Sequence, residues 1–311
     1  MEKIKVGGFT LLYEMNDNGA VITGIEGMDS YLDIPGYIFK GENSEPTIVA
    51  AVGKKALLGV NGLRHIVIPE TVTEIGDWAF SHCRHLVSLI VLNRKVTLGR
   101  GILEGCDRIN IICRGYEEHD DLSYLMATVV NKLPAGYLLG SAEAGTETWF
   151  RNYDSSLLQY LNDSDYAGSD ASALCGEEDI SYDDIRSVDG ELLGADMSYI
   201  IGVRKNKCNL CMLRLMHSEH LADETRTFLE KYISERTIAH TNNSAWLTLR
   251  DDLYDDASYL TLYLDITSPT QDDIELMLNN LGNEHPEMKA QLLKHSSGGN
   301  LVDSFFDNLL L

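Results

Sequence analysis

Two cysteines in the arrangement Cys208-x-x-Cys211 are the residues most able to do chemistry, because a thiolate pair can bind a metal ion or exchange disulfides. His217 and His220 follow closely and suggest zinc. A structural zinc site needs a second pair with matching spacing, which is not present. The two cysteines also share an apolar helical stripe with Leu215, so we interpret them as buried core thiols.

The segment His82-Cys83-Arg84-His85, taken with Cys106, is a second candidate metal site. Cys83 and Cys106 occupy equivalent positions of a repeat described below and are expected to point into its core. The two histidines flank a solvent-exposed turn. We therefore predict that the protein uses neither a metal nor another cofactor.

Clusters of carboxylates could bind calcium or hydrolyse a glycosidic bond. They are Glu177-Glu178-Asp179, Asp183-Asp184, Asp251-Asp252 and Asp255-Asp256. No segment has the alternating ligands and mid-loop glycine of a calcium loop. A glycosidase needs two carboxylates across a cleft, and a hydrolase with an acidic cleft between domains stays open as an alternative function. We favour helix caps and a solvated surface.

Motifs of the common enzyme classes are missing from the sequence. It contains no Gly-x-Ser-x-Gly, Walker loop, His-Glu-x-x-His or dinucleotide-binding fingerprint. We therefore predict no catalytic residues and a protein that is not an enzyme.

The elements that position these residues begin with a repeat. Gly53, Gly76 and Gly99 are 23 residues apart. Four apolar columns keep the same spacing: Ala56, Ala79 and Ile102; Leu57, Phe80 and Leu103; Leu63, Leu86 and Ile109; Ile66, Leu89 and Ile112. A fixed period of this length predicts stacked coils that share one core, which is a solenoid.

Within a coil, the segment from Leu63 to Ile68 alternates in polarity as a short strand does, and Pro69 ends it. The residues between its apolar positions are expected to face outward and to align between coils. The rows are Arg64, Val87 and Asn110; His65, Ser88 and Ile111; and Val67, Ile90 and Cys113. We predict that Arg64, His65, Val67, Val87, Ser88 and Ile90 bind a partner. Coverage of this face by the chain's own helical domain stays open.

The segment 68–86, which runs Ile-Pro-Glu-Thr-Val-Thr-Glu-Ile-Gly-Asp-Trp-Ala-Phe-Ser-His-Cys-Arg-His-Leu, resembles the BspA-like class of bacterial leucine-rich repeats. The coil at 68–91 matches closely. The neighbouring coils depart from the pattern, with Val60 in place of cysteine and Ile102-Leu103 in place of Ala-Phe. The resemblance covers about residues 9–115. It implies a leucine-rich-repeat fold used for protein or glycan contact, without shared catalytic residues.

Residues 9–40 fit a capping unit, with strands at 9–15 and 20–25 joined by a tight turn at Asn18-Gly19. Ile34-Pro35 repeats the Ile-Pro of the coils. We therefore expect a leucine-rich-repeat solenoid with an N-terminal β cap over residues 1–116.

The remainder, residues 117–311, is predicted to be an all-α domain, which makes the fold class α+β. Helix pairs of the expected length would also permit an α-helical repeat stack. The predicted helices run from Asp120-Asp121 to Leu133 and over 156–161, 197–217, 223–239, 270–281, 286–295 and 301–311.

The chain has 311 residues and a net charge of −23. Residues 1–150 hold 19 acidic against 13 basic residues, a net of −6, and residues 151–311 hold 29 against 12, a net of −17. Such an acidic surface argues against nucleic acids and membrane surfaces as partners.

The N-terminus lacks the apolar core of a signal peptide, and the six cysteines are too few for a disulfide scaffold. We therefore expect a cytoplasmic, non-enzymatic interaction module that binds a protein rather than a small molecule. A surface adhesin is an alternative if a leader is missing from this sequence.

Overall fold

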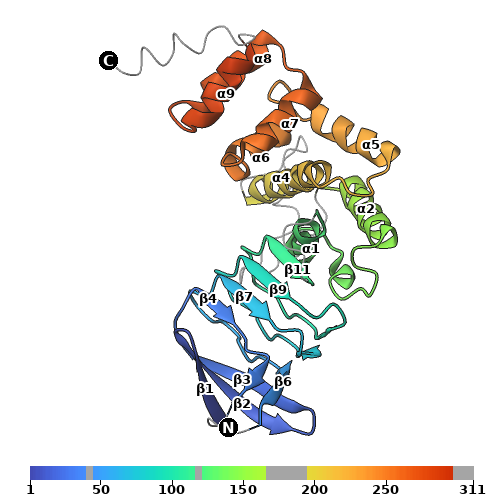
Figure 1. Cartoon of the computed structure of the whole chain (residues 1–311). Helices are drawn as coiled ribbons and strands as arrows, with labels where there is room; N and C mark the ends of the chain where they lie inside the picture. Colours follow the sequence, from blue (N-terminus) through green and yellow to red (C-terminus); the bar gives the residue numbers. More distant parts are fainter. Residues whose placement is uncertain (40–44, 116–120, 166–194, 297–311) are drawn as a thin grey trace, which may run out of the picture. The chain divides into compact units, whose positions relative to one another are not determined.

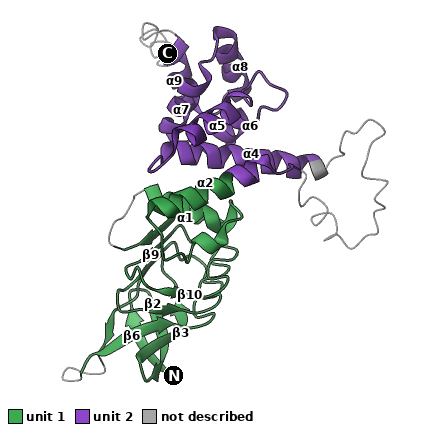
Figure 2. Ribbon diagram, turned by 90° about the vertical axis from the view of Figure 1, so that its right-hand side faces the viewer, with its two compact units in different colours: residues 1–157 green, residues 158–311 purple. Residues whose placement is uncertain are grey.

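The structure, a computed structural model, describes residues 1–39, 45–115, 121–165 and 195–296. The chain divides into two compact units, residues 1–157 and residues 158–311, coloured separately in Figure 2. Every described strand lies in the first unit, whereas the described part of the second unit is helical. The repeat region together with the helical part confirms the α+β class.

The chain begins with an antiparallel meander of β1 (Glu2–Val6), β2 (Phe9–Asn16) and β3 (Gly19–Gly27). The predicted tight turn between β2 and β3 is present, and the Asn16 side chain accepts a hydrogen bond from the Asn18 amide at 2.9 Å. Alternate residues at the start of β2 are buried, as expected for a strand with one face on a core.

Four strands of the repeat coils form a parallel sheet in the order β11-β9-β7-β4, which we call the four-stranded sheet (Figure 1). His65 pairs with Ser88, and Ser88 pairs with Ile111, so β7, β9 and β11 follow one another at the predicted period. The strands are β4 (Tyr31–Asp33), β7 (His65–Ile68), β9 (Ser88–Val91) and β11 (Ile111–Arg114).

The first of these strands lies outside the predicted period. Tyr31 of β4 pairs with His65 of β7, and the chain between them is longer than the chain between the later pairs. The extra length contains β5 (Tyr37–Ile38), which pairs antiparallel with β6 (Thr47–Val52). β4 was expected in the cap and is instead the first strand of the four-stranded sheet.

A second sheet carries the meander into the repeat. Its order is β1-β2-β3-β6-β8-β10, with β5 paired to β6. The strands β8 (Glu74–Ile75) and β10 (Thr97–Leu98) come from successive coils and pair in parallel. Because β3 pairs with β6, the meander covers the first coil in the way that a cap does.

The core of the repeat region consists of the predicted apolar columns. All twelve residues of the four columns are buried. Each buried leucine, isoleucine or phenylalanine among them contributes about 1.5–3 kcal/mol relative to an exposed one. A single coil could not bury these residues by itself, so the columns stabilise the stack and not the separate coils.

Four predicted helices are confirmed in the structure. They are α1 (Asp121–Asn131), α4 (Ala195–Met216), α8 (Gln271–Leu281) and α9 (Pro286–Ser296). Thr270 and Asp273 form a complete capping box at the start of α8. The predicted helix at 301–311 lies outside the described residues.

Other helices differ from the prediction. α2 (Glu147–Asn162) begins well before the predicted start at 156 and buries Trp149, Phe150 and Tyr153 in its first half. α5 (Asp223–Ser234) ends before the predicted end at 239. The helices α6 (Ser244–Asp252) and α7 (Ala257–Thr267), and the 3-10 turn η1 (Gly136–Leu138), were not predicted.

Within the second unit α4 packs against α5, α6 and α7, while α8 packs against α9. The first unit includes α1, η1 and most of α2, whereas the change of sequence pattern after Arg114 predicted them as part of the helical half. The α-helical repeat stack stays a prediction. Across the described residues, no helix combines the length and apolar character needed to cross a membrane.

Candidate functional site

The outer face of the four-stranded sheet holds the residues predicted to bind a partner. Strand pairing aligns two rows of outward residues across the sheet. The rows are Tyr31, His65, Ser88 and Ile111, and Asp33, Val67, Ile90 and Cys113. The predicted alignment of His65 with Ser88 and of Val67 with Ile90 is therefore confirmed.

Both rows are exposed at β4 and are buried or half-buried on β9 and β11. Tyr31 has 51% of its surface exposed, and His65 is exposed as well. Val67, Ile90 and Ile111 are half-buried. Helix α1 packs against β11, at the less exposed end of the sheet. The open part of the face therefore lies over β4 and β7.

Two residues expected on the open face are buried. Ser88 has only 6% of its surface exposed, and Cys113 only 2%. The expectation that every outward position is open is wrong at these two positions. Packing of α1 beside β11 closes that end of the face, and the Cys113 thiol donates to the Gly115 carbonyl at 3.4 Å.

Arg64 and Val87 lie one residue before β7 and β9, at the edge of the face. The Val87 amide donates to the Arg64 carbonyl at 2.8 Å, and the Asn110 amide donates to the Val87 carbonyl at 3.0 Å. These bonds extend the strand ladder by one residue. Arg64 and Asn110 are exposed at this edge, whereas Val87 between them is half-buried.

Tyr31 and Asp33 belong to the same face but were not predicted. A constant period does not reach them, because the chain from β4 to β7 is longer than one regular coil. The Ile-Pro pairs could have revealed them, because Ile34 precedes Ile68 by the same interval that separates Tyr31 from His65. That equivalence places Tyr31 against His65 on the basis of sequence alone.

The open end of the face combines residue types that are common in binding hot spots. Tyr31 contributes an exposed aromatic ring, Arg64 a cation and Asp33 a carboxylate. Tyrosine and arginine are enriched where truncation costs most binding energy. The half-buried Val67 gives the centre of the face an apolar surface.

The turns at the edge of the coils keep their backbone shape whatever the residue type. Two positions per coil have positive φ: Lys55, Trp78 and Gly101, and Gly59, His82 and Gly105. The ammonium groups of Lys54 and Lys55 lie 5.1 and 5.6 Å from the centre of the Trp78 ring. Neither ammonium has a carboxylate partner in the part of the chain that the structure describes. At Trp78 and His82 the positive φ is imposed by the stacking of the coils, because these residue types rarely adopt a left-handed conformation by themselves.

The repeat cysteines are structural hydrogen-bond donors. The Cys83 thiol donates to the Leu57 carbonyl at 3.1 Å, and the Cys106 thiol donates to the Phe80 carbonyl at 3.2 Å. Burial raises the pKa of Cys83 to about 11 and that of Cys106 to about 12. Each thiol therefore stays protonated at neutral pH and ties its coil to the preceding one.

The Cys208-x-x-Cys211 pair also lies in a core. Both residues are completely buried on α4, and the Cys208 sulfur lies 3.3 Å from the Ser244 hydroxyl. Burial raises the pKa of Cys208 to about 11 and raises the pKa of Cys211 as well. Within the described ranges, no three His, Cys, Asp or Glu side chains come together closely enough to hold a metal ion.

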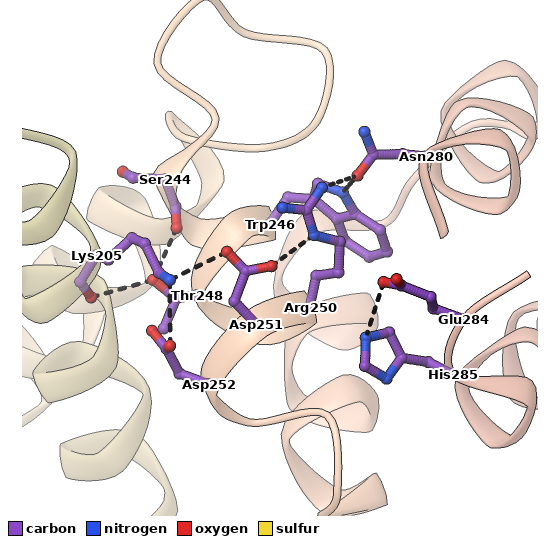
Figure 3. Close-up of polar contacts among 10 residues, drawn as sticks. All are labelled: Lys205, Ser244, Trp246, Thr248, Arg250, Asp251, Asp252, Asn280, Glu284 and His285. Carbon is purple, nitrogen blue, oxygen red and sulfur yellow. Dashed lines mark hydrogen bonds and ion pairs between the residues drawn. The ribbon is translucent and has the colours of Figure 1, made fainter. Parts of the chain in front are cut away.

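Asp251 and Asp252 pair with cations of α4 and α6 (Figure 3). The Lys205 ammonium donates to Asp251 at 3.0 Å and to Asp252 at 3.1 Å. The Arg250 guanidinium donates to Asp251 at 2.6 Å and to Asn280 at 2.8 Å, which links α6 to α8. These residues hold α4, α6 and α8 together.

A catalytic acid would need a carboxyl group with a raised pKa. Burial acts to raise the pKa of Asp251, but hydrogen bonds from Arg250 and Lys205 outweigh burial and lower it. Asp256 accepts a hydrogen bond from the Ser258 amide at 2.9 Å and caps α7. The carboxylates at 177–179 and 183–184 lie outside the described residues. The described clusters therefore do not favour the hydrolase alternative.

The pairing of Asp251 with Lys205 and Arg250 predicts that the stability of the fold depends on pH. Because the pKa of Asp251 in the folded chain lies below the unfolded value of about 3.9, its ionised form stabilises the fold above about pH 4. This stabilisation is lost as the pH falls through the folded pKa. We expect Asp251→Asn to lower stability at pH 7 and to flatten the loss between pH 5 and pH 3, as measured by urea unfolding. An equally steep acid loss in the variant would contradict this role.

A buried cation lies further along α4. The Lys207 side chain is 1% exposed, and its ammonium donates to the Asp163 carbonyl at 2.6 Å and to the Asp165 carboxylate at 2.9 Å. Arg204 binds the other oxygen of Asp165 at 2.8 Å. Burial acts to raise the pKa of Asp165, but the hydrogen bonds from Arg204 and Lys207 outweigh it and lower the pKa. Asp165 therefore carries the charge that permits burial of Lys207.

Comparison with known proteins identifies only the repeat region. The sequence signature of a BspA type leucine rich repeat region, in 6 copies, matches residues 29–116. No curated protein matches the chain.

Three solved structures are similar to parts of the chain. A leucine rich cell surface protein from Faecalibacterium prausnitzii A2-165 is 25% identical over 35% of this chain and 30% of its own, with a TM-score of 0.30. A leucine-rich repeat protein from Bacteroides capillosus ATCC 29799 is 18% identical over 37% of this chain and 99% of its own, with a TM-score of 0.29. One from Bacteroides ovatus ATCC 8483 is 23% identical over 35% of this chain and 28% of its own, with a TM-score of 0.31. The chain thus spans less than a third of the first and third proteins.

Proposed function

Because residues 29–116 are a BspA-type leucine-rich repeat region, we propose that the chain is a non-enzymatic interaction module that binds a protein through the open face of the four-stranded sheet. The observation that carries the proposal is the exposed end of that face. Tyr31, Arg64 and His65 project from it, with Val67 between them half-buried. A mixed aromatic, charged and apolar surface of this kind suits a protein partner.

The size of the face limits the mode of binding. Three strand spacings make the sheet about 14 Å wide, and two outward rows extend about 7 Å along the strands. The resulting area, about 100 Å², is far below the roughly 800 Å² per partner of a stable interface. The partner must therefore also contact surrounding surface, such as Met28, which is 77% exposed and lies beside the start of β7.

Charge and cysteine usage support the rest of the proposal. A net charge of −23 disfavours binding to nucleic acids or anionic membranes. The described cysteines are free and buried, as expected in a reducing compartment, and we propose a cytoplasmic location on this ground. The partner is proposed to be a protein rather than a small molecule.

The proposal is tested by affinity capture with the full chain. We expect the wild-type chain to retain a partner from the source cell, and Tyr31→Ala/His65→Ala to weaken its binding at least tenfold, because two hot-spot residues each contribute about 1 kcal/mol or more. Binding is measured by titration of the purified partner.

The matched control is Glu74→Ala/Thr97→Ala, which changes a paired and exposed couple on the second sheet. We expect this control to bind the partner as the wild type does. Equal binding by all three chains, or capture of no partner, would refute the proposed role of the face.

A further inference from the structure

Successive coils are joined by a regular set of backbone hydrogen bonds along their turns. In each of two coils, three amides spaced two residues apart donate to three carbonyls of the following coil, at distances from 2.6 to 3.0 Å. The pairs are Lys55 to Asp77, Leu57 to Ala79 and Gly59 to Ser81, then Trp78 to Arg100, Phe80 to Ile102 and His82 to Glu104.

The third coil has the same three donors without acceptors. They are the amides of Gly101, Leu103 and Gly105, and none of them donates a hydrogen bond to any residue that the structure describes. Leu103 is only 2% exposed, and a buried amide without an acceptor is rare in folded proteins. These amides have no acceptor because the next helix after β11 is α1, and no fourth coil follows in the described part of the chain to supply the carbonyls.

A backbone carbonyl without a hydrogen-bond donor among the described residues lies at the same edge. The Gly76 amide donates to the Val52 carbonyl at 2.8 Å, and the Gly99 amide donates to the Ile75 carbonyl at 2.7 Å. The next carbonyl of this series is that of Leu98, which accepts no hydrogen bond from the described residues. The free edge of the third coil therefore offers three donors and one acceptor in the spacing of a polypeptide backbone.

This edge lines a groove of about 500 Å³, which we call the terminal-coil groove. One wall is the third coil from Leu98 to Glu104. The other wall contains Val129 and Val130 of α1 and Tyr137 of η1, whose side chain is 65% exposed. The helical wall is mainly apolar, so its valine side chains offer no hydrogen-bond partners to the unpaired amides and carbonyl of the third coil.

We propose that the terminal-coil groove binds a polypeptide segment of a partner protein, which pairs with the free edge of the third coil through main-chain hydrogen bonds. Backbone carbonyls at alternate residues of the segment would accept from Gly101, Leu103 and Gly105, and a backbone amide would donate to Leu98. Addition of a peptide to an open edge is an established mode of recognition, in which the main chain supplies affinity and side-chain pockets supply specificity. Val129, Val130 and Tyr137 would contact the apolar side chains of the segment.

This site is separate from the face of the four-stranded sheet and does not depend on the proposed function. Tyr31 and His65 do not line the terminal-coil groove. Unchanged binding in the Tyr31→Ala/His65→Ala chain would therefore count against the sheet face alone, whereas failure of the groove tests below would leave the sheet face unaffected.

The first test needs no ligand and compares equivalent amides of two coils by hydrogen exchange. We expect the amides of Gly101, Leu103 and Gly105 to exchange at least tenfold faster than those of Trp78, Phe80 and His82, because only the latter have acceptors. Equal protection of both sets in the free chain would mean that the edge is already covered, which would overturn the proposal.

The second test selects random 12-residue peptides displayed on phage against the immobilised full chain. We expect selected peptides to bind the wild-type chain and to slow exchange of the Gly101, Leu103 and Gly105 amides. Gly140→Trp should raise the Kd at least tenfold, because Gly140 lines the groove and has open space where a side chain would be added.

Gly202→Trp is the matched control, since this glycine of α4 also has open space around it and lies outside the groove. It should change the Kd less than twofold. Unchanged exchange of the Trp78, Phe80 and His82 amides shows that Gly140→Trp folds. The proposal is overturned if no peptide is enriched, if Gly140→Trp binds the peptides as the wild type does, or if binding leaves the three amides unprotected.

Discussion

We expect Gly76→Ala to lower the free energy of unfolding of the repeat region by about 3 kcal/mol, the upper part of the usual range for overpacking. A Cβ at this position would lie 2.6 Å from the Lys54 nitrogen and 2.9 Å from the Gly53 carbonyl carbon. Both atoms belong to the backbone of the preceding coil and cannot rotate away as a side chain would. The coils must separate, which weakens the hydrogen bond from the Gly76 amide to the Val52 carbonyl.

The same substitution at Gly202 is the control for this prediction. A Cβ at Gly202 meets nothing within 4 Å, and the residue lies inside α4. Gly202→Ala should therefore stabilise the chain by about 0.5–1 kcal/mol, since alanine loses less backbone entropy in a helix. Urea unfolding followed by circular dichroism measures both effects. A loss below about 1 kcal/mol for Gly76→Ala would show that the coils can adjust to a methyl group.

The second large effect is expected for Asp165→Ala, which should lower the free energy of unfolding of the helical unit by about 3 kcal/mol. The substitution removes the only carboxylate that binds Lys207 among the described residues, while that lysine remains 1% exposed. Removing one partner of a buried pair leaves an uncompensated charge in a poorly solvated place. We expect the lower end of the usual range because the Asp165 side chain itself is 23% exposed.

Asp163→Ala is the matched control two residues away. Asp163 contributes only its backbone carbonyl to Lys207, and its side chain is exposed. This variant should change stability by less than about 0.5 kcal/mol, as is usual for a surface substitution. A double change, Asp165→Ala/Lys207→Met, should recover part of the loss because no buried charge remains. Equal losses in the two single variants would contradict a specific role for Asp165.

The repeat was predictable because its signal is periodic and local. Gly53, Gly76 and Gly99 recur at one spacing, and the structure shows that a Cβ at Gly76 or Gly99 would strike the backbone of the coil before it. The apolar columns are equally direct, since residues in one column must share one core. Strand pairing among β7, β9 and β11 then followed from the same period.

The first coil was not predictable from that period. An insertion separates β4 from the regular coils, so Tyr31 and Asp33 fell outside the alignment. The insertion leaves the sheet unchanged, because β5 pairs with β6 and brings the chain back into register. Strand pairing tolerates extra residues between strands, whereas a fixed period does not.

In the helical half, helices with a long stripe or a strong cap were predicted, and short ones were missed. The capping box at Thr270 marked α8 correctly. α6 is short and buries mainly Ala245, Trp246 and Leu249, which is too few for a period of about 3.6 to stand out. The carboxylates Asp251 and Asp252 at the end of α6 were predicted to be helix caps or solvated surface residues. Their pairing with Lys205 of α4 could not be predicted, because it depends on contact between segments that are distant in the sequence.

By itself, the sequence determined the repeat period, the residues of the repeat core and the outward rows, because each depends on the spacing of nearby residues along a regular backbone. Only the tertiary structure decided which outward residues stay open. Cys113 is buried where α1 packs beside β11, Ser88 is buried on β9 between the neighbouring strands β7 and β11, and Tyr31 is exposed on β4 at the other end of the sheet. The unpaired amides of Gly101, Leu103 and Gly105 are likewise a tertiary fact, since their sequence equivalents Trp78, Phe80 and His82 are satisfied by the next coil. A residue's type specifies what it can donate or bury, and the packing of distant segments decides whether a partner is there.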